Sequence, residues 1–385
     1  MPSLPLNSAQ IIELAHLISG QTTPDCIQED HWAELIELAL DNGVGGMLLW
    51  SSRQSGWTLP DQSEWKRLLY SVRHNGLRSM LLEKVRWQVA SAFDHAKIPA
   101  IWLKGIALAY THYPQPYLRP MADLDVLVPM GQLALARDVL RGLNFQPAEI
   151  DFFELVKFTD QARHHECFLD RSGKVKLDLH FRLLVPSILN HLDEKEMNWF
   201  WTQTEELTLD GPSFRILKPD ANLLYLCAHV ILQNQGEPLD LLHLLDLHIL
   251  LTQSPLHWDL IEHQASVLHW TDAVGQAVGL LPALFGTQLP DKMPMAFLQA
   301  GMDKEQLLYN LHPLINTRRW DDWRSAYGRM NIFQRVRLIW LTLFPPEIYI
   351  RKLYHLSHSQ LILPYYVQHF LDGGREMIRA LVGIH

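Results

Sequence analysis

The sequence has few cysteines, no long apolar run and no basic excess. Only Cys26, Cys167 and Cys227 occur among 385 residues, and no two of them form a Cys-x-x-Cys pair. This usage argues against a disulfide scaffold and predicts a reducing, cytoplasmic setting. No uninterrupted apolar stretch reaches the ~18 residues of a membrane span, and the N-terminus lacks a basic segment followed by an apolar one. We therefore expect neither a membrane-spanning helix nor a signal peptide.

Charge is also scarce, and its sign does not suit an extended nucleic-acid surface. Charged residues make up 19% of the chain, and the formal net charge is −9. A protein that follows a phosphate backbone needs a basic face, so we expect no broad footprint of that kind. Hydrophobic residues make up 48% of the chain, which is typical of a well-packed globular protein. The length allows two or three domains.

Hydrophobic spacing divides the chain into three segments. Residues 1–95 and 218–385 carry apolar residues at helical spacing, and helices are expected over 219–233 and 239–251. Residues 96–217 instead hold short apolar runs separated by turn residues. The sequence therefore predicts an α+β fold, in which a core that contains strands is flanked by an N-terminal helical region and a C-terminal helical domain.

Within the core, the strands are expected to be short. The expected strands lie at 99–103, 121–128, 163–169 and 174–183, with a further hairpin over 207–217. The turn Asp170-Arg-Ser-Gly173, with its closing glycine, is typical of a hairpin that joins the third strand to the fourth.

The strand Met121-Ala-Asp-Leu-Asp-Val-Leu-Val128 is the most informative feature of the chain. Successive side chains of a strand point to opposite faces, so Asp123 and Asp125 share one face while Leu124 and Val126 share the other. Two adjacent carboxylates repel each other and are costly to desolvate. They are tolerated when a cation lies between them, and a divalent ion such as Mg²⁺ is the usual one. This strand is therefore a candidate metal site.

A third carboxylate lies on the second strand of the expected hairpin. Apolar residues alternate with polar ones from Val175 to Leu183, which places Asp178 and His180 on the polar face. Two Mg²⁺ ions in one site need several bridging carboxylates. We expect Asp123 and Asp125 to bridge the two ions, and Asp178 to bind the catalytic ion and help deprotonate the acceptor. A strand that merely faces solvent gives the same alternation.

Lys104-Gly105 is a candidate phosphate-binding element. It lies where the expected strand 99–103 ends and a helix begins. Backbone N–H groups at a helix N-terminus attract phosphate, glycine permits a close approach of the backbone, and Lys104 adds a positive charge. A single Lys-Gly pair is a weak signal, and its position shortly before Asp123 strengthens it.

These motifs together resemble the nucleotidyltransferases of the DNA-polymerase-β superfamily. Leu103-Lys-Gly-Ile-Ala-Leu-Ala-Tyr110, Arg119-Pro-Met-Ala-Asp-Leu-Asp-Val-Leu-Val128 and Leu177-Asp-Leu-His180 carry the resemblance, which covers about residues 98–185. The pattern is most similar to an uncharacterised bacterial NTP-transferase group with abortive-infection-type relatives. The resemblance implies a small mixed sheet with helices on one face, and Mg²⁺-dependent transfer of an NMP from an NTP.

The resemblance also assigns residues, with one departure. It implies catalytic and metal-binding roles for Asp123, Asp125 and Asp178, and nucleotide binding by Lys104, Gly105, Arg119 and His180. The superfamily usually has Gly-Ser or Gly-Gly after the first strand, whereas this chain has Gly105-Ile106. Ile106 lacks the hydroxyl group of the usual serine, so one phosphate contact is lost. Either Lys104 replaces this contact, or the grip on the triphosphate is weaker.

Other polar residues have competing interpretations. Arg119 either binds a phosphate or pairs with the aspartates, and His180 either contacts substrate, orients Asp178 or is an ordinary hydrogen-bonded histidine. Asp246, in an apolar helix, either makes a structural tie or contacts nucleotide or acceptor. His164 and His165 are adjacent in an expected strand and so should face opposite sides, which argues against a shared metal ion.

Three functions therefore remain open from the sequence. The favoured one is a nucleotidyltransferase with two Mg²⁺ ions, whose acceptor is a small molecule or a protein. The second is a scaffold with this fold that binds nucleotide or a partner without catalysis, which the Ile106 departure favours. The third is a metal-dependent glycosyltransferase, which the helical first 95 residues disfavour. The sequence specifies neither the NTP, nor the acceptor, nor the oligomeric state.

Overall fold

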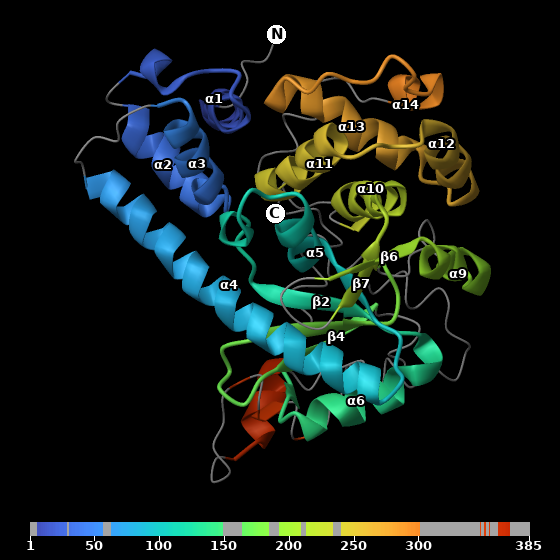
Figure 1. Cartoon of the computed structure of the whole chain (residues 1–385). Helices are drawn as coiled ribbons and strands as arrows, with labels where there is room; N and C mark the ends of the chain where they lie inside the picture. Colours follow the sequence, from blue (N-terminus) through green and yellow to red (C-terminus); the bar gives the residue numbers. More distant parts are fainter. Residues whose placement is uncertain are drawn as a thin grey trace.

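A computed structural model shows a mixed α/β chain built around one sheet (Figure 1). It describes residues 6–28, 31–56, 63–148, 164–184, 192–208, 213–233, 240–300, 347, 350–351, 354 and 361–369. Over these residues, helices lie before and after the strands in the sequence. The expected α+β class, with helical regions on either side of a small mixed sheet, is confirmed.

The segment before the sheet is helical, as expected. Its helices are α1 (Leu6–Ser19), α2 (Trp32–Asp41), α3 (Gly45–Gln54) and the long α4 (Ser63–His95). Figure 1 shows α1, α2 and α3 grouped at one end of α4, which then runs along the sheet. Trp32 of α2 packs against Trp65 of α4, with 5.1 Å between ring centroids. The tryptophans therefore contribute core packing here.

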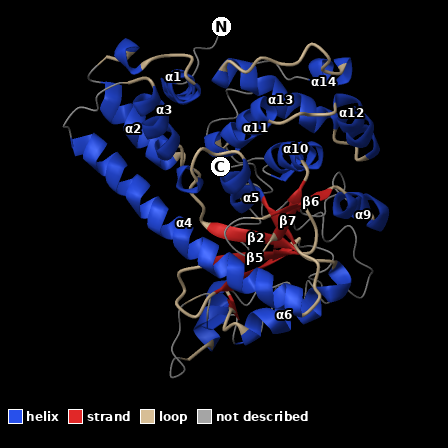
Figure 2. Ribbon diagram, viewed as in Figure 1, coloured by secondary structure: helices blue, strands red, loops and turns tan. Residues whose placement is uncertain are grey.

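Seven strands form a single sheet of mixed direction (Figure 2). They are β1 (Ile101–Leu103), β2 (Asp123–Leu127), β3 (Gln146–Pro147), β4 (His165–Leu169), β5 (Lys176–His180), β6 (Thr204–Leu207) and β7 (Phe214–Leu217). Their spatial order is β3-β4-β5-β2-β1-β7-β6. The strand β2 pairs in parallel with β5 and antiparallel with β1. The candidate carboxylate strands are thus neighbours at the centre of the sheet.

The first expected hairpin is confirmed, and the second is present but begins at Thr204 instead of residue 207. The strands β4 and β5 pair antiparallel, and their turn ends at Gly173, whose φ of 67° suits glycine. The strands β6 and β7 also pair antiparallel. Arg163 and residues 209–212, which fall within these expected hairpins, lie outside the described residues.

The two faces of the sheet have different partners. Leu124, Val126 and Leu177 belong to an apolar cluster with residues of α4 and of α6 (Leu133–Gly142). Leu103 and Leu127 instead belong to a second cluster, which holds the N-terminal and C-terminal helices. Alternation along β2 therefore directs Leu124 and Val126 toward α4 and α6, and Asp123 and Asp125 toward the opposite face.

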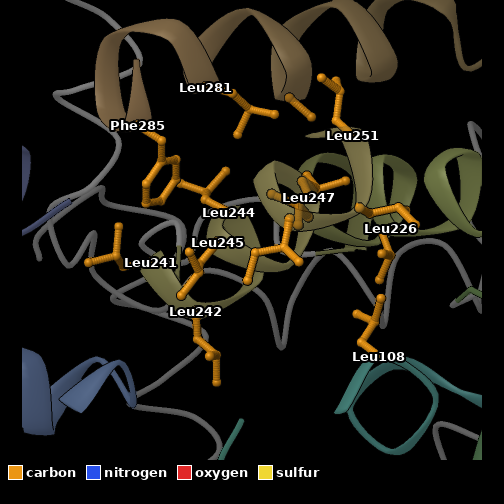
Figure 3. Packing of buried hydrophobic residues seen from close by; sticks show 14 of the residues in the cluster. Leu108, Leu226, Leu241, Leu242, Leu244, Leu245, Leu247, Leu251, Leu281 and Phe285 are labelled. Atoms are coloured by element: carbon orange, nitrogen blue, oxygen red, sulfur yellow. The ribbon is translucent and has the colours of Figure 1, made fainter. Parts of the chain in front are cut away.

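Helices that follow β5 in sequence lie on the side of this second face. They are α9 (Glu194–Thr202), α10 (Pro219–Ala228), α11 (Leu241–Gln253), α12 (Trp258–Val267), α13 (Thr271–Phe285) and α14 (Met295–Ala300), and a π-helical stretch, His229–Gln233, continues α10. Figure 3 shows leucines of α11 packed with Leu226 of α10 and with Leu281 and Phe285 of α13. The expected helix 219–233 is confirmed. The expected helix 239–251 is confirmed from Leu241 onward, whereas residue 239 lies outside the described residues. None of the described helices is both long enough and apolar enough to cross a bilayer.

His248 of α11 is expected to make stability depend on pH. Its ring stacks on Phe285, its Nδ1 lies 2.8 Å from Thr287 Oγ1, and burial lowers its pKa to about 4. The folded state therefore resists protonation that the unfolded chain accepts below about pH 6.5, so stability falls as the pH drops from about 6.5 to 4. Urea unfolding should show that this loss is about 2–3 kcal/mol smaller in His248→Gln. The exposed His263→Gln serves as the control. If the free energy of unfolding fell equally with pH in the wild type and in His248→Gln, His248 would not be the source of the pH dependence.

Candidate functional site

The three predicted carboxylates lie together at the centre of the sheet. In the parallel pairing of β2 with β5, Asp125 lies directly opposite Asp178, and Asp123 lies opposite Lys176. Asp125 and Asp178 are each 6% exposed, whereas Asp123 is partly exposed. All three line one cavity of about 520 Å³. The structure therefore brings together the acidic residues that the two strand motifs predicted.

Two lysines and a histidine contact these carboxylates. Lys176 Nζ lies 3.2 Å from Asp123 Oδ2 and 2.9 Å from Asp178 Oδ2, so it bridges the two strands. Lys104 Nζ lies 3.1 Å from Asp125 Oδ1, and His180 Nε2 lies 2.7 Å from the same oxygen. Lys104 and Lys176 thus supply the positive charge that the clustered carboxylates require.

The pKa values of the two aspartates of β2 are shifted in opposite directions. Burial raises the pKa of Asp123, and the negative charges of Asp125 and Asp178 add to this rise. Burial also opposes the charge of Asp125, but Lys104 and the hydrogen bond from His180 outweigh it and hold its pKa well below the ordinary value. Burial likewise opposes the charge of Lys104, but Asp125 raises its pKa. At neutral pH, Asp125 and Lys104 are therefore a charged pair.

The turn from β1 into α5 (Lys104–Thr111) has an unusual backbone. Lys104 has a φ of 49°, in the left-handed region that disfavours residues with a Cβ atom. A Cβ atom on Gly105 would lie 2.7 Å from Arg119 Nη1, so any other residue there would displace the Arg119 guanidinium. Ile106 is 1% exposed and belongs to the apolar cluster beneath the sheet. The side chain that departs from the superfamily pattern therefore packs in the core.

Arg119 makes a buried ion pair with the C-terminal helices. Its Nη2 lies 2.7 Å from Asp246 Oδ2 and its Nε 3.3 Å from Oδ1, while Tyr113 donates to Oδ1 at 2.7 Å. Asp246 is fully buried on α11. The structural tie considered for Asp246 is therefore present, and it ties the loop before β2 to α11. Arg119 also lines the cavity, so its contact with nucleotide stays a prediction.

Part of the cavity wall comes from residues that sequence motifs did not single out. Asp41 ends α2 and is followed by Asn42 and Gly43, while Asp240 caps α11 and Leu242 and His243 lie in its first turn. His229, at the end of α10, completes this side. Asn42-Gly43 is a recognisable turn signal, and Gly43 has a φ of 68°. Nothing in the sequence indicates that this turn faces Asp123.

The expectation that His164 and His165 face opposite sides was wrong. The strand β4 begins at His165, so His164 lies just before it and the alternation rule does not apply to the pair. One nitrogen from each of His164, His165 and His180 lies within 4.8 Å of the others. Burial, together with His165 and His180, holds the pKa of His164 well below its ordinary value. Among the described residues, these three histidines are grouped beside Asp125 and Asp178.

The mixed sheet thus presents Asp-x-Asp and a third aspartate on adjacent central strands. The model of a family described as uncharacterised nucleotidyltransferase matches residues 28–286, which is more than half of the chain. The chain therefore belongs to this family. No curated protein and no solved structure matches it. The match extends well beyond the 98–185 region of the sequence resemblance and includes α2 and the helices α10 to α13.

Proposed function

We propose that the protein is a Mg²⁺-dependent nucleotidyltransferase, which moves an NMP from an NTP to a small-molecule or protein acceptor and releases pyrophosphate. The observation that carries this proposal is the register of β2 and β5. It places Asp125 opposite Asp178, and Asp123 lies two residues before Asp125 on the same face of β2. All three carboxylates line one cavity. Three convergent carboxylates beside a strand-to-helix turn are the arrangement that nucleotidyl transfer needs.

The residues present fit a divalent metal site. Asp123, Asp125 and Asp178 are the oxygen donors that Mg²⁺ prefers. Among the described residues, Asp178 Oδ1 is buried without a hydrogen-bond partner, and such an atom is costly unless a cation or donor reaches it. Bound there, Mg²⁺ would neutralise the charge that develops on the attacking and leaving oxygens of the transferred phosphoryl group.

The side chains of this chain have separable roles in the proposed reaction. The acceptor hydroxyl attacks the α-phosphorus, the bond to the bridging oxygen of the pyrophosphate breaks, and Asp178 accepts the proton of the hydroxyl. Lys104 and the first backbone N–H groups of α5 attract the phosphates. His180 is 1% exposed and donates to Asp125, so we assign it a positioning role. This differs from the nucleotide contact that the family resemblance implied.

Labelled nucleotides test the proposed reaction. The protein is incubated with Mg²⁺, cell extract and each α-³²P-labelled NTP in turn, and the products are separated into protein and small-molecule fractions. We expect label from one or more NTPs in one fraction, and none from the γ-labelled NTP. Transfer that persists in Asp123→Ala/Asp125→Ala would refute the proposal. The fraction that carries the label identifies the class of acceptor.

A non-catalytic scaffold is the second candidate, and the lysines are the observation that favours it. Lys104 and Lys176 already neutralise the carboxylates without a metal ion. A scaffold of this kind would keep a stable charged cluster and transfer no label. Absence of transfer from every NTP, together with absence of Mg²⁺-dependent NTP binding in equilibrium dialysis, would favour it over the enzyme.

Lys176→Met is expected to tighten the binding of a divalent ion in the absence of nucleotide. The ammonium group of Lys176 competes for Asp123 and Asp178, and its side chain is 40% exposed. Because solvent weakens such pairs, removing the competitor should gain only about 1 kcal/mol, or about three- to tenfold in affinity. Titration with Mn²⁺, followed by electron paramagnetic resonance, measures this. Unchanged or weaker Mn²⁺ binding would show that Lys176 does not compete with the metal.

A further inference from the structure

Three histidines lie beside the carboxylates, and nucleotidyl transfer does not use them as a group. His164 precedes β4, His165 opens β4 and His180 closes β5. In the antiparallel pairing of β4 with β5, His165 lies opposite His180, and the carbonyl oxygen of His164 accepts from Phe181 N at 2.9 Å. The backbone therefore fixes all three residues relative to one another.

We propose that His164, His165 and His180 bind one transition-metal ion, for which Zn²⁺ is the best match. Imidazole nitrogens suit Zn²⁺ and its neighbours in the first transition row, whereas Mg²⁺ prefers oxygen. The three candidate nitrogens lie within 4.8 Å of one another. Zinc with bonds of about 2.0–2.1 Å to nitrogen holds tetrahedral ligands about 3.3 Å apart, so modest ring rotations close the site.

The hydrogen bonds of His180 support this assignment. A carboxylate oxygen of Asp125 accepts in the contact at 2.7 Å, so His180 Nε2 donates. In a neutral imidazole, Nδ1 then carries the lone pair. Among the described residues, this buried Nδ1 has no hydrogen-bond partner. A metal ion would satisfy it, and Asp125 would act as the carboxylate that orients a metal-bound histidine.

His165 also has one ring nitrogen near the cluster and the other near a carboxylate, although the carboxylate is more distant than in His180. Its Nδ1 lies 3.0 Å from His164 Nε2, and its Nε2 lies 3.7 Å from Asp178 Oδ2. The nitrogen near His164 is thus directed into the cluster, and the other is directed toward a carboxylate. The His165 side chain is 30% exposed, which gives an ion a route from solvent. Each of the two strand histidines therefore connects the cluster to one of the proposed Mg²⁺ ligands.

Co²⁺ binding to the whole chain tests this site without any assay of activity. Protein freed of metal by chelator is titrated with Co²⁺, whose visible absorption reports nitrogen ligation, and Zn²⁺ is then added. We expect this absorption to saturate at one Co²⁺ per chain and to disappear when Zn²⁺ displaces the ion. His165→Gln, at a partly exposed position, should remove the absorption while the far-UV circular dichroism is unchanged. The exposed His263→Gln on α12 should leave binding unaffected.

The two aspartates of β2 provide the matched pair of variants. Of these two, Asp125 is the one that accepts a hydrogen bond from His180, so Asp125→Asn should weaken Co²⁺ binding by about 10–100-fold, the usual effect of losing such an orienting group. Asp123→Asn should leave it unchanged. Equal losses in both variants would place the ion on the carboxylates and overturn the proposal. Absence of stoichiometric Co²⁺ binding, or full binding by His165→Gln, would also overturn it.

Discussion

Asp125→Asn is expected to reduce kcat/KM for nucleotidyl transfer by at least about 10³-fold. The pKa of Asp125 is held well below its ordinary value, so the carboxylate is charged at neutral pH and available to a metal ion. An amide of the same shape keeps one oxygen but loses the charge. Metal-ion catalysis contributes several kcal/mol to phosphoryl-type transfer, and about 4 kcal/mol corresponds to about 10³-fold in rate. Initial rates with the labelled NTP measure the effect.

The control for this variant is Asp138→Asn, the same chemical change on α6, where the side chain is 71% exposed. We expect normal activity from it. Because Asp125→Asn also leaves the buried ammonium group of Lys104 without its charged partner, urea unfolding must accompany the rate measurement. A folded Asp125→Asn protein that retains more than a tenth of the wild-type rate would show that this carboxylate does not hold the catalytic ion.

Asp246→Leu is expected to destabilise the protein by about 3–5 kcal/mol. The ion pair with Arg119 is almost fully buried, with side chains 7% and 0% exposed, so the change leaves a buried guanidinium without its partner. Arg119→Met/Asp246→Leu should recover most of this loss, because a buried ion pair is often replaced by apolar residues at little cost. Urea unfolding of the single and double variants measures both effects.

The double variant also separates the two roles of Arg119. If Arg119 contacts nucleotide as well as Asp246, the double variant should be stable but have a raised KM for the NTP. A stable double variant with an unchanged KM would restrict Arg119 to the structural role. Asp138→Leu removes a carboxylate from an exposed pair with Arg141 and should cost less than about 1 kcal/mol. If Asp246→Leu lost no more free energy of unfolding than this control, the buried ion pair would be contradicted.

The central strands could be predicted from the sequence because the alternation of apolar and polar residues is visible within each strand. Leu124 and Val126 mark one face of β2, and they place Asp123 and Asp125 on the other without any knowledge of the tertiary structure. The same rule located Asp178 on β5. The rule does not predict the register of β2 with β5. The pairing of the whole strands determines this register, which places Asp125 opposite Asp178.

Contacts between distant parts of the chain could not be predicted in this way. Arg119 and Asp246 are separated by 127 residues, and neither residue type indicates the other as its partner. The contact of Lys104 with Asp125 illustrates the same limit, since the sequence did not indicate this pairing. The histidine cluster was missed for a different reason. His164 lies one residue before β4, and strand boundaries are the least certain part of any sequence-based prediction.

The division of the cavity wall among distant segments limits how far the chain can be shortened. A fragment restricted to 96–217 would retain all three carboxylates but lose Asp41 to Gly43 on one side and Asp240 to His243 on the other. Bulk water would then reach Asp125 and Asp178, and the higher dielectric constant would weaken their attraction for Lys104 and for any cation. The smallest piece that can reproduce the chemistry of this site must therefore extend from α2 to α11, as an uninterrupted polypeptide or as fragments that reassemble.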